Sequence, residues 1–117
     1  MSELHVKTTA FFDLLNDTDL ESRRAKARSL LASDLRYVDP HAPEEMWGSE
    51  KYLDFLVMFK GKFPELRFQP EEIAAHHGIS KTPWTLVKQD GSTFSQGEFV
   101  LDWEDGLLIR RIFGFMR

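Results

Sequence analysis

The sequence contains no cysteine, so disulfide bridges, thiolate metal sites and cysteine nucleophiles are all excluded. No apolar run approaches the length that a membrane-spanning helix needs. The first residues of the chain form neither the basic region nor the apolar region of a secretory signal. We therefore expect a cytoplasmic protein that does not bind membranes.

Basic residues are too few to mark a nucleic-acid-binding surface. The chain has 15 basic and 19 acidic residues, which gives a formal net charge of −4 at pH 7, whereas nucleic-acid-binding proteins usually carry a basic stripe. The one local cluster, Arg23, Arg24, Lys26 and Arg28, is interpreted as the exposed face of a helix rather than a phosphate-binding patch. We expect no nucleic-acid partner.

Repeats, low-complexity segments and linkers are also missing, so the 117 residues predict a single domain, residues 1–117. Aromatic side chains, in contrast, are abundant: the chain has ten Phe, three Trp and two Tyr. Aromatic residues supply much of the buried area of a small domain, and they also line apolar ligand pockets. The composition therefore predicts a well-packed core that has the material for a pocket.

The first half of the sequence has the periodicity of α-helices. Apolar residues recur at helical spacing over residues 4–15, 20–31 and 52–63. Thr18 and Glu21 form a capping-box pattern before the second of these helices.

A short strand, residues 35–38, is expected to follow the second helix. Asp39-Pro40 ends it, because proline cannot donate to a strand ladder. A loop then runs through Pro43 to Ser49, which is the expected N-cap of the third helix.

From residue 66 onward the apolar period changes to two, which is typical of strands. Turns are expected at Gln89–Ser92 and at Glu104–Gly106, and they bound strands over residues 94–102 and 107–116. Helices followed by a run of antiparallel strands predict an α+β domain with the helices on one face of the sheet.

A series of short motifs resembles a known superfamily. In chain order they are Tyr37-Val38-Asp39-Pro40-His41, Trp47-Gly48-Ser49-Glu50, Phe63-Pro64-Glu65-Leu66-Arg67-Phe68, His76-His77-Gly78 with the later Trp84, and Asp105-Gly106 with Phe113-Gly114-Phe115. Their order and spacing make nearly the whole chain similar to the SnoaL-like branch of the nuclear transport factor 2-like (NTF2-like) superfamily, which is related to ketosteroid isomerase-like proteins.

The resemblance implies a cone-shaped α+β fold. In it, N-terminal helices pack on a curved, mostly antiparallel sheet and enclose a pocket. It does not imply one function, because the superfamily includes isomerases, polyketide cyclases, dehydratases, epoxide hydrolases and proteins that only bind or dimerise.

Asp39 is the first candidate for a catalytic residue. In ketosteroid isomerases of this fold the general base is an aspartate in an Asp-Pro step after the first strand, and Asp39-Pro40 matches that position. A carboxylate at the mouth of an apolar pocket loses solvation, which makes it a stronger proton acceptor. Aspartate before proline is also a common turn former, and this alternative stays open.

Glu98 is the second candidate. It falls where the resemblance implies a protonated aspartate that donates to the developing oxyanion. The alternative is an ion pair with Arg111 on the neighbouring strand. The first-helix tyrosine that donates to the same oxyanion in those isomerases is missing, since residues 9–12 read Thr-Ala-Phe-Phe. The expectation that remains is a carboxylate in an apolar pocket rather than a steroid isomerase.

Three histidines lie within the motifs. His41, on the Asp39 loop, is expected to be an acid–base partner or a simple loop hydrogen-bonder. His76 and His77 are adjacent on a predicted strand and so would point to opposite faces, with His77 the better pocket candidate and a structural role as its alternative. No short ligand spacing supports a metal site, and we expect neither a metal nor a cofactor.

Arg111 is the last catalytic candidate. By alternation it shares a face with Ile109, and on an inward face it would place a positive charge beside Glu98 or Asp39. Such a set resembles the one with which epoxide hydrolases of this fold hold a water, and it would also anchor an anionic group. The alternative is a structural salt bridge or a dimer contact. The remaining residues expected to line a pocket are Tyr37, His41, Trp47, Phe55, Trp84, Phe113 and Phe115.

Two functions remain open from the sequence. The first is a small isomerase, cyclase or hydratase that acts on an apolar carbonyl compound, with Asp39 as base and Glu98, His77 or Arg111 as electrophilic partner. The second is a non-catalytic ligand-binding or dimerisation domain. We expect an apolar small molecule as partner, and a homodimer through the open face of the sheet, because that face needs covering.

Overall fold

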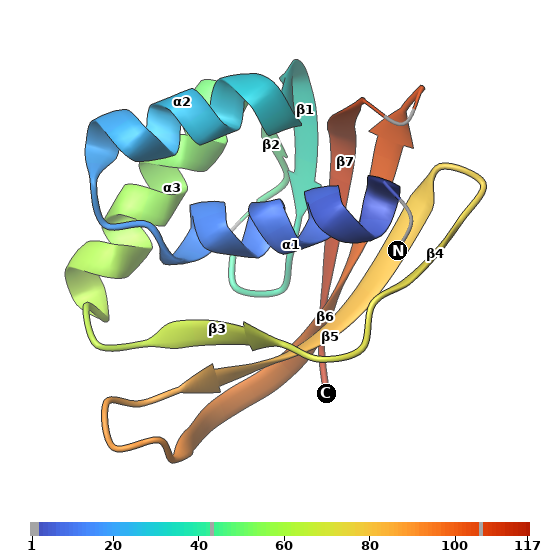
Figure 1. Ribbon diagram of the computed structural model, residues 1–117. Helices are drawn as coiled ribbons and strands as arrows, with labels where there is room; N and C mark the ends of the chain where they lie inside the picture. Colours follow the sequence, from blue (N-terminus) through green and yellow to red (C-terminus); the bar gives the residue numbers. More distant parts are fainter. Residues whose placement is uncertain (1–2, 43, 106) are drawn as a thin grey trace.

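The computed structural model describes residues 3–42, 44–105 and 107–117. Three helices precede most of the strands: α1 (Glu3–Asn16), α2 (Leu20–Leu30) and α3 (Ser49–Lys62). Figure 1 shows these helices gathered on one side of a single curved sheet. The predicted α+β arrangement, with the helices on one face of the sheet, is confirmed. The loop residue Pro43 and the turn residue Gly106 named above lie outside the described residues.

The sheet has seven strands in the order β2-β1-β7-β6-β5-β3, and β4 pairs with β5 beside this path. Every pair is antiparallel except β1 with β7, which run parallel and place Val38 opposite Phe113. The end of β1 therefore lies beside the C-terminal strand. The strands are β1 (Leu31–Val38), β2 (Met46–Trp47), β3 (Arg67–Pro70), β4 (Ala74–His76), β5 (Ile79–Val87), β6 (Thr93–Glu104) and β7 (Leu108–Met116).

A connected cluster of aromatic rings lies in the core between the helices and the sheet. Phe11 and Phe12 of α1 pack against Phe99 of β6, with ring centroids 5.8 and 6.0 Å apart. Phe68 of β3 extends the cluster to Trp84 of β5, with centroids 5.1 Å apart. Each such ring pair contributes about 0.5–1.5 kcal/mol beyond the area that it buries. The aromatic-rich composition thus fills the space where the helices meet the sheet.

Two helix starts differ from the sequence patterns. The N-cap of α2 is Asp19, whose side chain accepts a 2.8 Å hydrogen bond from the Ser22 backbone N–H. The capping box predicted at Thr18 is wrong, because the helix begins one residue later than that pattern assumed. At α3 the N-cap position is held by Gly48, with φ 99° and no side-chain cap, and Ser49 is the first helical residue.

Arg23 is buried, although the sequence pattern placed it on an exposed basic face. The residue is 3 % exposed, and its side chain donates to the Leu15 carbonyl oxygen at 3.4 Å. Burial lowers the pKa of its guanidinium. Arg24 and Arg28 are exposed as predicted.

A bulge in β7 changes which side chains share a face. Trp103 pairs with Ile109 and Asp102 pairs with Arg111, so Arg110 is an extra residue on this strand. Ile109 is fully buried, whereas Arg111 is exposed. The prediction that Arg111 and Ile109 share a face is wrong, because the extra residue interrupts the alternation between them.

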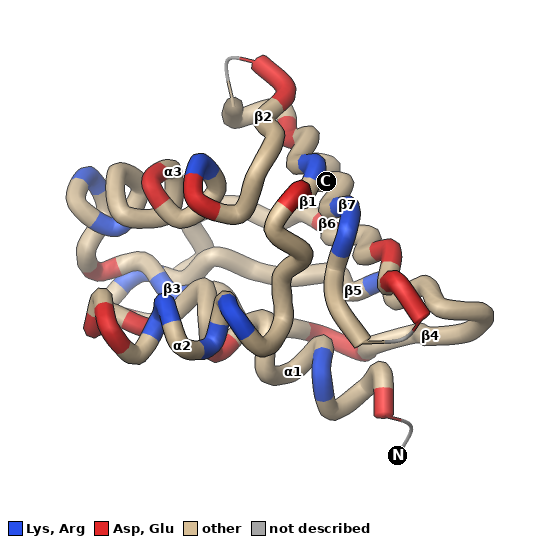
Figure 2. The backbone as a smooth tube through the Cα atoms, turned by 90° about the horizontal axis from the view of Figure 1, so that it is seen from above, with Lys and Arg blue, Asp and Glu red and all other residues tan. Residues whose placement is uncertain are grey.

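Charges of both signs are interspersed on the helices. Figure 2 shows acidic and basic residues along α3 and basic residues along α2. None of the helices in the described part of the chain is long and apolar enough to span a membrane.

The connection between α1 and α2 is fastened by Asp17. Its Oδ2 accepts hydrogen bonds from Lys26 Nζ at 2.7 Å and from the Ser22 hydroxyl. These bonds, with Lys26 the larger cause, hold the pKa of the Asp17 carboxyl well below its ordinary value of 3.8.

Because the folded pKa is depressed, the stabilisation by Asp17 is present above pH 3.8 and is lost as the pH falls toward the folded value. We expect Asp17→Asn to lower the free energy of unfolding by about 1 kcal/mol at neutral pH. In acid the difference from the wild-type chain should shrink. Urea denaturation at a series of pH values measures it, and a difference that does not change with pH would contradict this role.

Candidate functional site

An apolar cavity of about 240 Å³ lies between the helices and the inner face of the sheet. An apolar cavity of about 150 Å³ holds benzene, and pockets for drug-sized ligands occupy about 300–1,000 Å³. The space therefore suits a molecule of one or two rings. Six phenylalanines make up much of its wall: Phe55, Phe59, Phe63, Phe68, Phe94 and Phe99.

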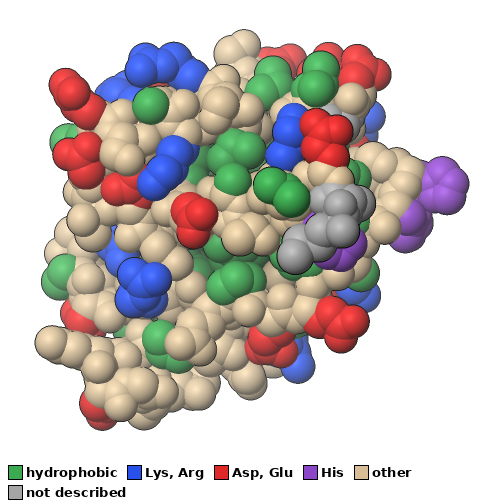
Figure 3. Space-filling view, viewed as in Figure 1, with side chains coloured by type: hydrophobic (Ala, Val, Ile, Leu, Met, Phe, Trp, Pro, Cys, Tyr) green, Lys and Arg blue, Asp and Glu red, His purple; other side chains and the backbone are tan. Residues whose placement is uncertain are grey.

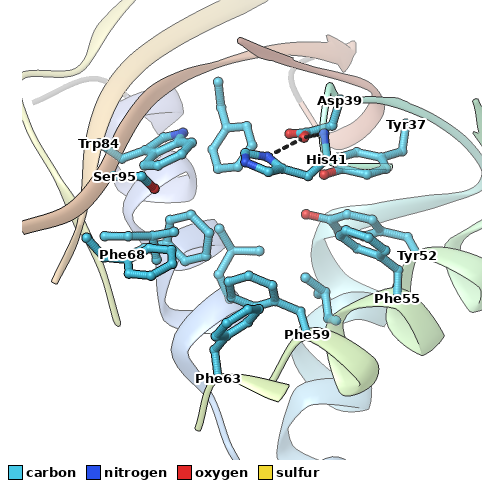
Figure 4. Close-up of a pocket in the computed structure, with 15 residues that line it drawn as sticks. Tyr37, Asp39, His41, Tyr52, Phe55, Phe59, Phe63, Phe68, Trp84 and Ser95 are labelled. Carbon is cyan, nitrogen blue, oxygen red and sulfur yellow. Dashed lines mark hydrogen bonds and ion pairs between the residues drawn. The ribbon is translucent and has the colours of Figure 1, made fainter. Parts of the chain in front are cut away.

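Polar side chains occur at two places in this wall. Figure 4 shows Asp39 and His41 beside two tyrosines on one side, and Trp84 with Ser95 on the other. Five of the residues that the sequence placed at a pocket line this cavity: Tyr37, Asp39, His41, Phe55 and Trp84.

Asp39 turns into the cavity at the end of β1. Its side chain is 5 % exposed. Oδ1 accepts hydrogen bonds from the His41 backbone N–H at 2.8 Å and, in the tautomer protonated at Nδ1, from the His41 ring at 2.9 Å. The His41 side chain is 51 % exposed, so this pair joins a buried carboxylate to the solvent.

Gly114 of β7 makes room for the Asp39 carboxylate. A Cβ atom at position 114 would lie 2.0 Å from Asp39 Oδ2 and 2.8 Å from its Cγ. The parallel pairing of β1 with β7 forces this close approach. Gly114 therefore positions Asp39, a role that the sequence pattern did not assign to it.

Two tyrosines face the Asp39–His41 pair. The rings of Tyr37 and Tyr52 are 4.6 Å apart, and Figure 4 shows both hydroxyls turned toward Asp39. Burial first, and then the neighbouring Tyr52 and Asp39, raise the pKa of the Tyr37 phenol. Burial first, and then Asp39, raise that of Tyr52. Both phenols therefore keep their protons at neutral pH and can donate hydrogen bonds.

Tyr52 and Ser95 are cavity residues that sequence reasoning did not single out. Tyr52 belongs to the apolar stripe of α3, where its hydroxyl has no separate sequence signal. Ser95 lies near the start of β6, where the pairing with β5 shifts register. Strand alternation alone therefore does not assign the face of Ser95. Only the three-dimensional arrangement brings them to the cavity.

Glu98 and Arg111 lie away from the cavity. Phe99 lines the cavity, so its neighbour Glu98 points to the outer face of the sheet. Arg111 pairs with Asp102 at 2.5 Å rather than with Glu98. The structure therefore does not bring either residue to Asp39, because strand alternation and the β7 bulge direct both outward.

His77 also lies away from the cavity. The strand β4 ends at His76, and His77 has φ 50° in the turn that leads to β5. The Nδ1 atoms of the two rings are 3.0 Å apart and both residues are exposed, so the expectation of opposite strand faces is wrong. Figure 3 shows histidine side chains projecting at this edge of the molecule. Among the described residues, no group of three or more His, Asp or Glu could hold a metal ion.

Three aromatic residues expected in the pocket lie outside it. Trp47 of the edge strand β2 is 61 % exposed, and Phe115 is 55 % exposed. The Arg36 guanidinium carbon lies 5.8 and 5.9 Å from the ring centroids of Trp47 and Phe113. Phe113 and Phe115 point outward because Gly114 between them faces Asp39. The homodimer predicted through the open sheet face stays a prediction.

The family is shown by comparison with known proteins. A family model described as a SnoaL-like domain matches residues 8–111, so the chain belongs to the SnoaL-like domain family. A search of the curated proteins finds no match.

Solved structures share the fold. A protein of Agrobacterium tumefaciens, provisionally named an isomerase of the SnoaL-like family, is 24% identical with a TM-score of 0.90, and the match covers 100% of this chain and 99% of that chain. A provisionally named ketosteroid isomerase of Kribbella flavida is 25% identical with a TM-score of 0.75, over 98% and 78% of the two chains. A provisionally named SnoaL-like polyketide cyclase of Jannaschia is 15% identical with a TM-score of 0.78, over 97% and 84%. The fold is thus NTF2-like.

The position of Asp39 can be tested with Gly114→Ala. The added methyl group would displace the carboxylate, so we expect a loss of about 1–3 kcal/mol in the free energy of unfolding and altered His41 ring signals in NMR spectra. In an Asp39→Ala background the same substitution should cost much less, since the obstructing carboxylate is gone.

Gly61→Ala is the matched control, because a Cβ atom there would meet nothing within 4 Å. It should leave the His41 signals unchanged. A Gly114→Ala chain with wild-type stability and unmoved His41 signals would contradict the positioning role.

Proposed function

We propose that the chain is a small-molecule enzyme of the isomerase or cyclase type, in which Asp39 removes a proton from a carbon next to a carbonyl group. The observation that carries this proposal is the buried Asp39 carboxylate, which faces an apolar cavity beside two protonated tyrosines. The provisional names of the isomerase and polyketide cyclase with this fold support the same class of chemistry.

The proton transfer is a balanced step. The Asp39 carboxylate accepts the proton, the electrons of the broken C–H bond form a C=C bond, and the negative charge moves to the carbonyl oxygen. Where a C=C bond of the ligand lies next to the deprotonated carbon, the charge extends along it, and Asp39 returns the proton to the far carbon of that bond to give an isomer. In a cyclase, the same carbon attacks a second carbonyl of the ligand and forms a C–C bond, the π electrons of that carbonyl move to its oxygen, and this oxygen takes the proton back from Asp39.

The tyrosines supply the donors for the negative oxygen. Residues Phe11 and Phe12 stand on α1 where the resemblance implied a tyrosine, and both are buried in the core. Tyr37 of β1 and Tyr52 of α3 offer phenol hydroxyls from another side of the same space. A donor fixed in advance in an apolar site stabilises a developing oxyanion far more than one in water does.

His41 orients Asp39 and connects it to the solvent. Its two hydrogen bonds to Oδ1 stabilise the ionised carboxylate and leave Oδ2 on the side of Gly114. Because the ring is half exposed, protons can exchange between this pair and water.

The proposal is tested with 2-tetralone, an apolar two-ring ketone that suits the cavity volume. In deuterium oxide, the wild-type chain should accelerate deuterium incorporation at the carbons next to the carbonyl, as followed by proton NMR. Asp39→Asn keeps the side-chain size but cannot accept the proton, so we expect the rate to fall by about 100- to 10,000-fold. Asp54→Asn, which changes an exposed aspartate of α3, is the control.

If Asp39→Asn exchanged deuterium as fast as the wild-type chain, Asp39 would not be the base. If the ketone bound with no accelerated exchange in any variant, the chain would be a ligand-binding domain, the alternative that the sequence left open.

Tyr52→Phe removes one phenol donor and leaves the ring. We expect deuterium exchange of 2-tetralone to slow by roughly 100-fold, while its dissociation constant changes little, because the hydroxyl acts mainly on the charge that develops during the reaction. Tyr37→Phe provides the comparison on the neighbouring ring. Unchanged exchange rates in both single variants and in the double variant would contradict the proposed role of the tyrosines as oxyanion donors.

A further inference from the structure

Two buried polar atoms in the cavity wall have no hydrogen-bond partner among the described residues: Trp84 Nε1 and Ser95 Oγ. Figure 4 shows these two side chains close together, across the cavity from Tyr37 and Tyr52. A buried N–H or O–H group without a partner costs free energy, and folded proteins contain few of them. Two such groups on one side of a ligand-sized cavity therefore point to a ligand atom that forms hydrogen bonds with both.

The location of these atoms sets them apart. Two further buried side-chain atoms lack a partner in the described part of the chain, Arg23 Nε and Thr82 Oγ1, but neither residue lines this cavity. Both unpartnered atoms of the cavity wall thus lie on the side away from Asp39.

A second buried tryptophan in the same sheet has a hydrogen-bond partner for its indole N–H. Trp103 Nε1 donates to Ser80 Oγ at 3.0 Å, and the Thr8 hydroxyl donates to the same oxygen at 2.9 Å. All three residues are buried. This sheet therefore does pair a buried indole with a serine, whereas the polar atoms of Trp84 and Ser95 have no partner among the described residues.

The Trp84 indole is held in one orientation before any ligand binds. Trp84 lies opposite Gly97 in the β5–β6 register, and a Cβ atom at position 97 would lie 2.3 Å from its Cζ2 and 2.6 Å from its Cη2. The indole therefore lies against β6 at Gly97, two residues from Ser95. The rings of Phe68 and Phe99 pack beside it, with centroids 5.1 and 5.4 Å from that of Trp84. A donor that is already fixed loses little entropy on binding.

We propose that Trp84 and Ser95 form a subsite for an oxygen atom at the far end of the ligand. The Trp84 N–H can only donate, and the Ser95 hydroxyl can donate or accept, so a hydroxyl or carbonyl oxygen satisfies both. The carbonyl oxygen at the other end faces Tyr37 and Tyr52, and for that end the inference rests on the proposed function. The ligand class is a two-ring apolar compound with an oxygen at each end.

A matched pair of ligands isolates this subsite. 6-Hydroxy-2-tetralone carries a second oxygen opposite its carbonyl, and 2-tetralone lacks it. The wild-type chain should bind the hydroxylated compound about 3- to 10-fold more tightly, the range of one neutral hydrogen bond. Isothermal titration calorimetry measures both dissociation constants.

Trp84→Phe and Ser95→Ala should each remove most of that preference. Ser95→Ala removes only an unpartnered hydroxyl, so its fold should be retained even if Trp84→Phe disturbs the core. Trp103→Phe is the matched control, since its indole N–H is already bonded to Ser80 and it lies outside the cavity wall. It should leave the preference unchanged.

NMR spectra of the three indole N–H groups give a direct readout. The Trp84 signal should move downfield with 6-hydroxy-2-tetralone and much less with 2-tetralone, while the signals of Trp47 and Trp103 stay in place. No preference in the wild-type chain, or an undiminished preference in both Trp84→Phe and Ser95→Ala, would overturn the subsite.

The outcomes separate the subsite from the proposed function. A preference that depends on Trp84 and Ser95 but is accompanied by no accelerated deuterium exchange would support the subsite and overturn the proposed enzymatic function. Exchange that depends on Asp39, with no preference for the hydroxylated ketone, would do the reverse. Failure of both ketones to bind would overturn both proposals.

Discussion

The close approach of the Asp39 carboxylate to the backbone of β7 at Gly114 places an acidic side chain in the apolar wall of the cavity, and the rest of the site is arranged around it. It exists because β1 and β7 pair in parallel and because position 114 carries no side chain. Removing a carboxylate from water costs several kcal/mol unless hydrogen bonds replace the lost solvation. The two bonds from His41 supply part of that replacement, so the Asp39 side chain is held inside an apolar wall.

The cavity combines this charge with an apolar interior and two separate sets of donors. Six phenylalanines leave few competing polar contacts, so in the proposed function the groups at the two ends of a ligand would orient it. On one side the tyrosines stay protonated because burial and Asp39 oppose their ionisation. On the other side the absence of a side chain at Gly97 makes room for the Trp84 indole against β6. Glycines thus set the geometry on both sides, because each lets a functional side chain lie against a strand.

Much of the fold could be predicted from the sequence, because apolar periodicity reports local structure directly. The helical stripes and the change to a period of two predicted helices followed by strands. The Asp-Pro step after β1 predicted that Asp39 lies at a pocket. Strand alternation was less reliable over distance. One extra residue at Arg110 was enough to place Arg111 outside, and the left-handed turn at His77 took that residue off its strand. Tyr52 and Ser95 could not be recognised, because their importance depends on which polar atoms meet across the cavity.

A crystal structure with 2,6-dihydroxynaphthalene would test the account most directly. This flat compound resembles the enol of 6-hydroxy-2-tetralone and has a hydroxyl group at each end. The account predicts that its rings fill the cavity, with one hydroxyl at Tyr37 and Tyr52, the other at Trp84 and Ser95, and a ring carbon facing the Asp39 carboxylate. A ligand bound outside the cavity, or one inside it with neither hydroxyl at these residues, would contradict the account.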